Sequence, residues 1–124
     1  MDEREGQPMK MMIVLSLALN ILVLVPVTYG MATDAPGMQQ AYGAASPARG
    51  ILLALYLAIL AASVVLLFKP IVPAVAALLA VQIAYKVMTP FTVGSWENPV
   101  VLSNLGIAAF HAVTLGLIVW GSGD

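Results

Sequence analysis

Charged residues divide the chain into long segments that are uncharged and mostly apolar. Four such segments cover about residues 11–30, 50–68, 71–89 and 100–120. A helix rises 1.5 Å per residue and needs about 20 apolar residues to cross a hydrocarbon layer of about 30 Å. Because the segments are continuously apolar rather than alternating, β-barrel strands are excluded. The pattern predicts an all-α, polytopic membrane protein, an antiparallel bundle of four transmembrane helices that forms a single domain over residues 1–124.

Composition agrees with this pattern and removes several classes of function. Hydrophobic residues make up 61% of the 124 residues and charged residues only 9%, whereas soluble domains carry about 25% charged residues. The net charge of -1 leaves no basic surface for nucleic acid. With no cysteine in the sequence, disulfides and thiolate metal sites are excluded.

The first apolar segment resembles a secretory signal in its basic residue and its small residues near Gly30. We interpret it as a retained span, because it is longer than the 7–15 residues typical of a signal core. Pro26 lies late in this segment and is expected to kink or loosen the last turn of the helix. The segment from Met31 to Arg49 is polar and rich in turn residues, so it is expected at the headgroups or in water.

The second and third spans are joined by Lys69-Pro70, with Pro73 expected in the first helical turn. So short a connection predicts a tight antiparallel hairpin. Small residues repeat every four positions on both spans, which predicts that two alanine ridges close this hairpin. The ridges are Ala54, Ala58 and Ala62 on the second span and Ala76, Ala80 and Ala84 on the third.

Four spans place both termini on one side of the membrane. That side carries Arg4, Lys10 and Lys69, and the opposite side carries Arg49 and Lys86. Because basic residues favour the cytoplasmic side, the margin of three to two predicts cytoplasmic termini. We expect a multi-pass protein of a bacterial inner membrane.

Polar residues inside the spans are few, and lipid tails cannot satisfy their hydrogen bonds. Asn20, Gln82 and His111 fall near the middle of three spans, with Ser63 within about a turn of the same depth. This layer either holds the helices together through hydrogen bonds or binds a polar headgroup, a quinone-like carbonyl or a partner's side chain. We expect Gln82, with Lys86, to face the fourth span.

Lys86 lies one turn before Pro90, near the end of the third span. One interpretation is that its ammonium bends back to the interface, with Glu97 or Asp34 as ionic partner. The other is that it binds a ligand. Asn104 and His111 share one face of the fourth span with small residues, so Asn20, Gln82, Lys86, Asn104 and His111 are the candidate residues for binding a ligand or partner.

The sequence lacks the sets of residues that catalysis within the membrane would need, and we expect no enzyme activity. No Asp or Glu lies within a span, and no Gly-rich phosphate loop or Ser/His/Asp set is present. Because His111 is the only histidine, neither a metal site built from several His or Cys nor two-His haem ligation within one chain is possible. We predict no metal and no cofactor. A single histidine could still ligate a haem or chlorin in a complex of several chains, but a hydrogen-bonded core histidine is the favoured interpretation.

The arrangement resembles the DoxX-like group of small four-helix bacterial membrane proteins. The features in common are Arg49-Gly50 at the start of an Ala/Leu-rich second span, the Lys69-Pro70 turn, and a fourth span that follows Asn98-Pro99. The likeness covers most of the chain in hydropathy and in the placement of turns. It implies a four-helix bundle and a role tied to larger membrane assemblies.

Two functions are compatible with these features. The first is a non-catalytic accessory or scaffold subunit that packs against other integral membrane subunits, or against itself, within the lipid bilayer. The alternative is a small binding or transport protein for an amphipathic ligand, such as a lipid, quinone or pigment, in a polar pocket between the third and fourth spans.

Overall fold

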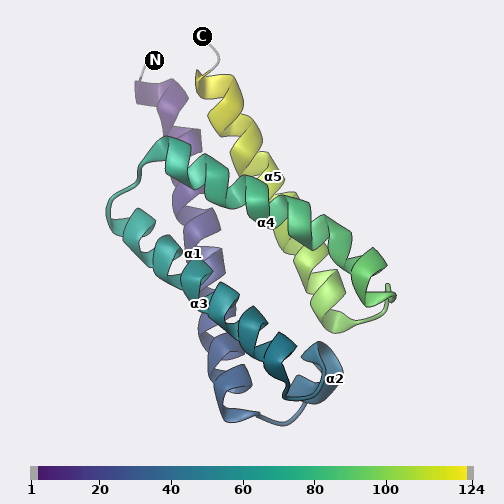
Figure 1. Ribbon diagram of the computed structural model, residues 1–124. Coiled ribbons are helices and arrows are strands. Elements are labelled where there is room, and N and C mark those ends of the chain that lie inside the picture. The colour runs from purple at the N-terminus through teal and green to yellow at the C-terminus, as the bar shows by residue number, and fades with distance from the viewer. Residues whose placement is uncertain (1–2, 123–124) are drawn as a thin grey trace.

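The computed structural model describes residues 3–122 and contains five helices in this range (Figure 1). They are α1 (Glu3–Thr33), the short α2 (Met38–Tyr42), α3 (Pro47–Phe68), α4 (Val72–Val93) and α5 (Pro99–Ser122). No strand occurs among the described residues. Four of the helices are long and apolar enough to cross a membrane. The prediction of an all-α protein with four candidate spans is therefore confirmed, and the spans indicate a multi-pass membrane protein.

The helix ends follow from local sequence. The Ser46 side chain caps α3 by accepting a hydrogen bond from the backbone N–H of Arg49 at 3.2 Å, and Pro47 occupies the first turn. Pro73 lies in the first turn of α4, as predicted. Gly94, with φ 77°, ends α4 in a left-handed conformation that glycine adopts without steric cost.

Two of the long helices continue through an internal proline. α1 runs past Pro26 to Thr33, so the loosening expected at Pro26 does not end it. α4 runs past Pro90, which has no N–H to donate to the carbonyl of Lys86. The Thr89 hydroxyl donates to that carbonyl instead at 2.6 Å. This replacement bond explains why α4 extends beyond the predicted limit at residue 89.

Consecutive long helices pack along each other at two of the three connections, and the exception is the pair α3 and α4. α4 packs along α5, and α1 packs against α3 and α5, whereas α3 and α4 approach each other only sparsely. The short connection at Lys69 exists, but the two helices diverge from it (Figure 1). The predicted tight hairpin of these two helices is therefore wrong.

The alanine ridges do not close α3 on α4. Ala54 and Ala58 on α3 are exposed, as are Ala80 and Ala84 on α4. The alanine ridges stay apart because each helix buries a different face. α4 turns Gln82 and Lys86 inward, because lipid accepts alanine but not these groups. Alanine faces gain little from association, since acyl chains are as apolar as they are.

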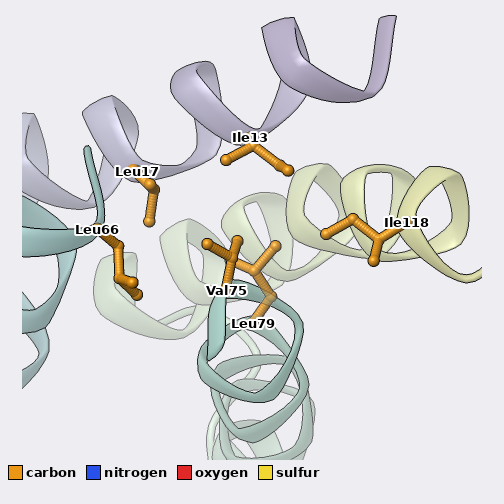
Figure 2. Close-up of a cluster of buried hydrophobic side chains, with 6 residues drawn as sticks. All are labelled: Ile13, Leu17, Leu66, Val75, Leu79 and Ile118. Atoms are coloured by element: carbon orange, nitrogen blue, oxygen red, sulfur yellow. The ribbon is translucent and has the colours of Figure 1, made fainter. Parts of the chain in front are cut away.

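An apolar cluster joins the four long helices at the end of the molecule where both termini lie (Figures 1 and 2). Its buried members are Ile13, Leu17, Leu66, Val75, Leu79 and Ile118. A second cluster, nearer the opposite end, contains Leu24 and Met31 of α1 together with Tyr56 and Ile59 of α3. The side chain of Arg4, which contributes to the predicted orientation, lies outside the described residues.

The connection from α1 to α3 is more ordered than predicted, because it contains α2. Gly37 and Gly43 flank α2 with φ angles of 90° and 88°. Arg49 ties this segment to α3: its guanidinium pairs with Asp34 at 2.7 Å and donates to the Gly43 carbonyl at 3.1 Å. Asn98, before α5, also donates to the carbonyl of Ala41 at 3.4 Å. α2 is thus held against the end of the molecule opposite the termini.

Candidate functional site

Polar side chains occupy much of the interior between the helices. All five candidate residues from the sequence, Asn20, Gln82, Lys86, Asn104 and His111, are buried. The structure buries further polar side chains that sequence reasoning did not select as candidates, namely Ser16, Thr28, Arg49, Ser63 and Thr114. The spacing contained a signal for two of them: Ser16 precedes Asn20 by one turn on α1, and Thr114 follows His111 by about one turn on α5.

Two pairs of these side chains link α1 to its neighbours. Asn20 donates to the hydroxyl of Ser63 on α3 at 3.1 Å. The hydroxyls of Ser16 and Thr114 lie 2.6 Å apart and join α1 to α5. For these residues, the structure supports the interpretation that polar groups hold the helices together. Asn20 therefore bonds with Ser63, and not with Gln82 or His111 as a single layer would require.

His111 and Gln82 do not complete such a layer. The His111 side chain is fully enclosed, with 0% exposure, and neither ring nitrogen has a hydrogen-bond partner among the described residues. The ring lies near the backbone of Ser16 but outside hydrogen-bonding geometry. The Gln82 amide nitrogen donates to the Leu78 carbonyl at 3.4 Å, while its Oε1 has no partner in this part of the chain. The interpretation of His111 as a hydrogen-bonded core histidine therefore stays a prediction: the ring is in the core, and its hydrogen-bond partner is not established.

Lys86 points into the protein. Its side chain is 5% exposed and lies on the buried face of α4, one turn after Gln82. The ion pair expected with Asp34 or Glu97 is absent from the described residues, because Asp34 pairs with Arg49 instead. Side chains on a helix lean toward its N-terminus, which directs Lys86 away from the nearby end of α4. Its Nζ lies 5.9 Å from the centre of the Tyr85 ring.

A cavity of about 160 Å³ lies beside Lys86. Asn104 of α5 lines it together with Lys86, and three tyrosine rings form another part of the wall. The rest of the wall is mainly apolar and comes from α1 and the start of α5. The lining residues are Val23, Leu24, Val27, Tyr42, Tyr56, Tyr85, Lys86, Pro99, Val100, Ser103 and Asn104. Lys86 and Asn104 are thus the two candidate residues that the structure brings together around an open space.

A second, adjoining cavity of about 480 Å³ extends between α3 and α4 beneath α2. It shares Tyr42, Tyr56, Tyr85, Val100 and Asn104 with the first cavity. Leu52 on one side and Val93 on the other are among its apolar walls. This space exists because α3 and α4 diverge from the turn at Lys69, so the failure of the predicted hairpin and the presence of the cavity have one cause.

The tyrosines reach the cavities from three different elements. Tyr42 comes from α2 and meets the ring of Tyr56 on α3 edge to face, with centroids 6.1 Å apart. Burial raises the pKa of Tyr42 above its ordinary value of 10.0, so its hydroxyl is neutral near pH 7. The sequence analysis missed Tyr42 and Tyr56, although a tyrosine in the otherwise apolar second span was a visible signal.

The two cavities offer hydrogen-bond donors, one cationic side chain and apolar walls. No carboxylate lines either cavity. Gln82, His111 and Asn20 line neither of them, so the predicted set of five divides into two cavity residues and three packed ones. Among the described residues, no group of three or more His, Cys, Asp or Glu side chains is placed to hold a metal ion.

Comparisons with protein-family models, with curated proteins and with solved structures find no match to this chain. The resemblance to the DoxX-like group stays a prediction, and the functional argument depends on the geometry of the cavities.

Proposed function

We propose that this chain is an integral membrane protein that binds a small amphipathic molecule in the two adjoining cavities, with Lys86 and Asn104 at the polar end. The single observation that carries this proposal is a buried lysine on the wall of a cavity that continues between α3 and α4. On this proposal the four helices form a membrane-embedded bundle that is open at one end, with both termini in the cytoplasm.

The chemistry of the walls supports binding. Ligand sites are concave and mostly apolar, with a few polar groups that fix orientation, and they typically measure about 300–1,000 Å³. The larger cavity, at about 480 Å³, falls in this range. A lysine inside a membrane protein is costly, by about 2.5–3.5 kcal/mol at a helix centre on insertion scales, and such residues usually mark a functional site. A ligand that meets Lys86 would offset part of this cost.

Filling the cavity tests the proposal. Val100 lines both cavities, so Val100→Trp is expected to displace the ligand. Val113 is 56% exposed on the same helix, which makes Val113→Trp the matched control. The full chain would be extracted with mild detergent, equilibrated with a panel of single-chain amphiphiles and examined by native mass spectrometry. Binding that is lost in Val100→Trp and kept in Val113→Trp supports the proposal. If both variants bind the amphiphiles equally well, the proposal is contradicted. It is also contradicted if neither the variants nor the parent chain binds any of them.

A second candidate function is the accessory or scaffold subunit, and the exposed alanine faces favour it. Ala54, Ala58, Ala80 and Ala84 lie on the outer surface, where small residues allow close approach of another helix. Ala58→Phe would obstruct such an approach, whereas Leu57→Phe changes a neighbouring side chain that is already large and 48% exposed. A scaffold role predicts that only Ala58→Phe reduces self-association or loses co-purifying membrane subunits, with amphiphile binding unchanged.

A further inference from the structure

The charge balance of the interior identifies the kind of head group that fits the cavities. The described residues contain one ion pair, Arg49 with Asp34. Lys86 has no ionic partner there, and neither cavity wall contains an acidic side chain. Resting on the proposed function, the geometry points to a single-chain amphiphile with one carboxylate as its head, for which Lys86 is the counter-ion and Asn104 a hydrogen-bond donor.

A single negative charge matches the site better than the alternatives. Taking a charge out of water is expensive unless an opposite charge with good hydrogen bonds compensates it. One carboxylate neutralises one ammonium. A phosphate monoester carries about -1.5 to -2 charges near pH 7, which would leave excess negative charge in an apolar space. A cationic head group would meet Lys86 with charge repulsion, and a neutral alcohol would leave it unpaired.

The donors around the smaller cavity suit the acceptors of a carboxylate. Lysine offers three N–H donors and the amide of asparagine two, while an ionised carboxylate is an acceptor only, with about four lone-pair sites. Lys86 and Asn104 reach this cavity from α4 and α5, which pack along each other. Tyr42, Tyr56 and Tyr85, each with one hydroxyl donor, line the same cavity. A head group placed here would accept from several elements at once.

The larger cavity provides a path for one hydrocarbon chain. From the three shared tyrosines it runs past Leu52 of α3 and Val93 of α4, in the region where these helices diverge. On the proposed embedding this opening lies near the membrane interface, because α2 contributes Gln39 and Gln40 to its wall. An amphiphile could therefore enter sideways between α3 and α4, with its head leading toward Lys86 and its tail left among the apolar walls.

Native mass spectrometry of the full chain with oleate, oleyl alcohol and oleylamine tests the inference. Oleate is expected to bind one per chain, and the alcohol and amine at least about tenfold more weakly. Losing a hydrogen bond to a charged group typically lowers affinity by about 10- to 100-fold, which is the reduction expected for oleate in Lys86→Gln. Lys69→Gln is the matched control, because Lys69 is exposed at the opposite end of α3.

The outcomes separate this inference from the proposed function. If oleyl alcohol binds as tightly as oleate and Val100→Trp abolishes both, the carboxylate assignment is overturned while the binding function stands. If no amphiphile binds, both fail. Tighter, Lys86-dependent binding of a lysophosphatidate would overturn the carboxylate class in favour of a phosphate. Should Lys86→Gln not fold by circular dichroism, Asn104→Leu replaces it, and unchanged oleate binding in that variant refutes the inference.

Discussion

The hydrogen bond between Ser16 and Thr114 permits a quantitative test of how the helices are held together. Both side chains are completely buried, and their oxygens lie 2.6 Å apart. Thr114 has additional acceptors within reach, since its hydroxyl lies 3.4 Å from the carbonyls of Met12 and Phe110. The Ser16 hydroxyl has no second partner in the described part of the chain. The two ends of the bond are therefore not equivalent.

This asymmetry predicts different costs for removing each end. In Ser16→Ala, the Thr114 hydroxyl can still donate to a carbonyl, so the free energy of unfolding should fall by about 0.6 kcal/mol, the average for such bonds in membrane proteins. In Thr114→Val, which keeps the side-chain shape, the Ser16 hydroxyl loses its partner. An unsatisfied buried group adds about 1 kcal/mol or more, so the total loss should reach about 1.5–2 kcal/mol.

A double-mutant cycle in bicelles, with unfolding by sodium dodecyl sulfate followed by circular dichroism, measures these values. The double variant isolates the coupling energy of the pair, expected between about 0.6 and 1.7 kcal/mol. Val113→Ala, at an exposed position on the same helix, shows the cost of a change that faces lipid. A coupling energy of zero would refute the reasoning, as would a larger loss for Ser16→Ala than for Thr114→Val.

Two shorter predictions concern other buried polar groups. His111→Leu is expected to raise the free energy of unfolding by about 1 kcal/mol, because it removes a buried ring without hydrogen bonds; a lower melting temperature would show that the ring has a partner. Asp34→Asn removes the ion pair with Arg49 and should lower the free energy of unfolding. The expected loss is only about 1 kcal/mol, because the Asp34 side chain is half-exposed. The control Glu97→Gln alters a carboxylate with no ion pair in the described range, and equal melting temperatures for the two variants would contradict the assigned role of Asp34.

The number and approximate limits of the long helices could be predicted from the sequence, because hydrocarbon thickness imposes a minimum apolar length. Pro73 also marks the start of α4, because its fixed backbone geometry suits the first helical turn. The extension of α4 past Pro90 could not be predicted in this way. It depends on the Thr89 hydroxyl taking over the carbonyl of Lys86, which is a contact of the folded helix.

The burial of polar side chains followed from the sequence, but their pairing did not. The low tolerance of lipid for Gln82 and Lys86 requires an inward orientation whatever the neighbouring helix is. Which group each side chain meets depends on how the helices are arranged. The sequence made Asp34 a candidate ionic partner for Lys86. In the structure Asp34 pairs with Arg49 instead, because the fold of the α1–α3 connection brings these two side chains together. The position of Tyr42 in the cavity wall likewise depends on α2, a helix that the turn-rich sequence did not predict.

The divergence of α3 and α4 has a physical basis that also explains where the cavities lie. Near the termini, large apolar side chains such as Leu66 and Val75 bring all four long helices together. Toward the other end, α3 and α4 present exposed alanines to lipid, and these provide little attraction between the helices. The polar and aromatic contacts there join α2 to α3 through Arg49 and Tyr42, and α2 to the start of α5 through Asn98. None of these contacts joins α3 to α4. The helices are therefore free to separate at the end where Lys86 is buried, and the opening that this creates is the one that a ligand would use.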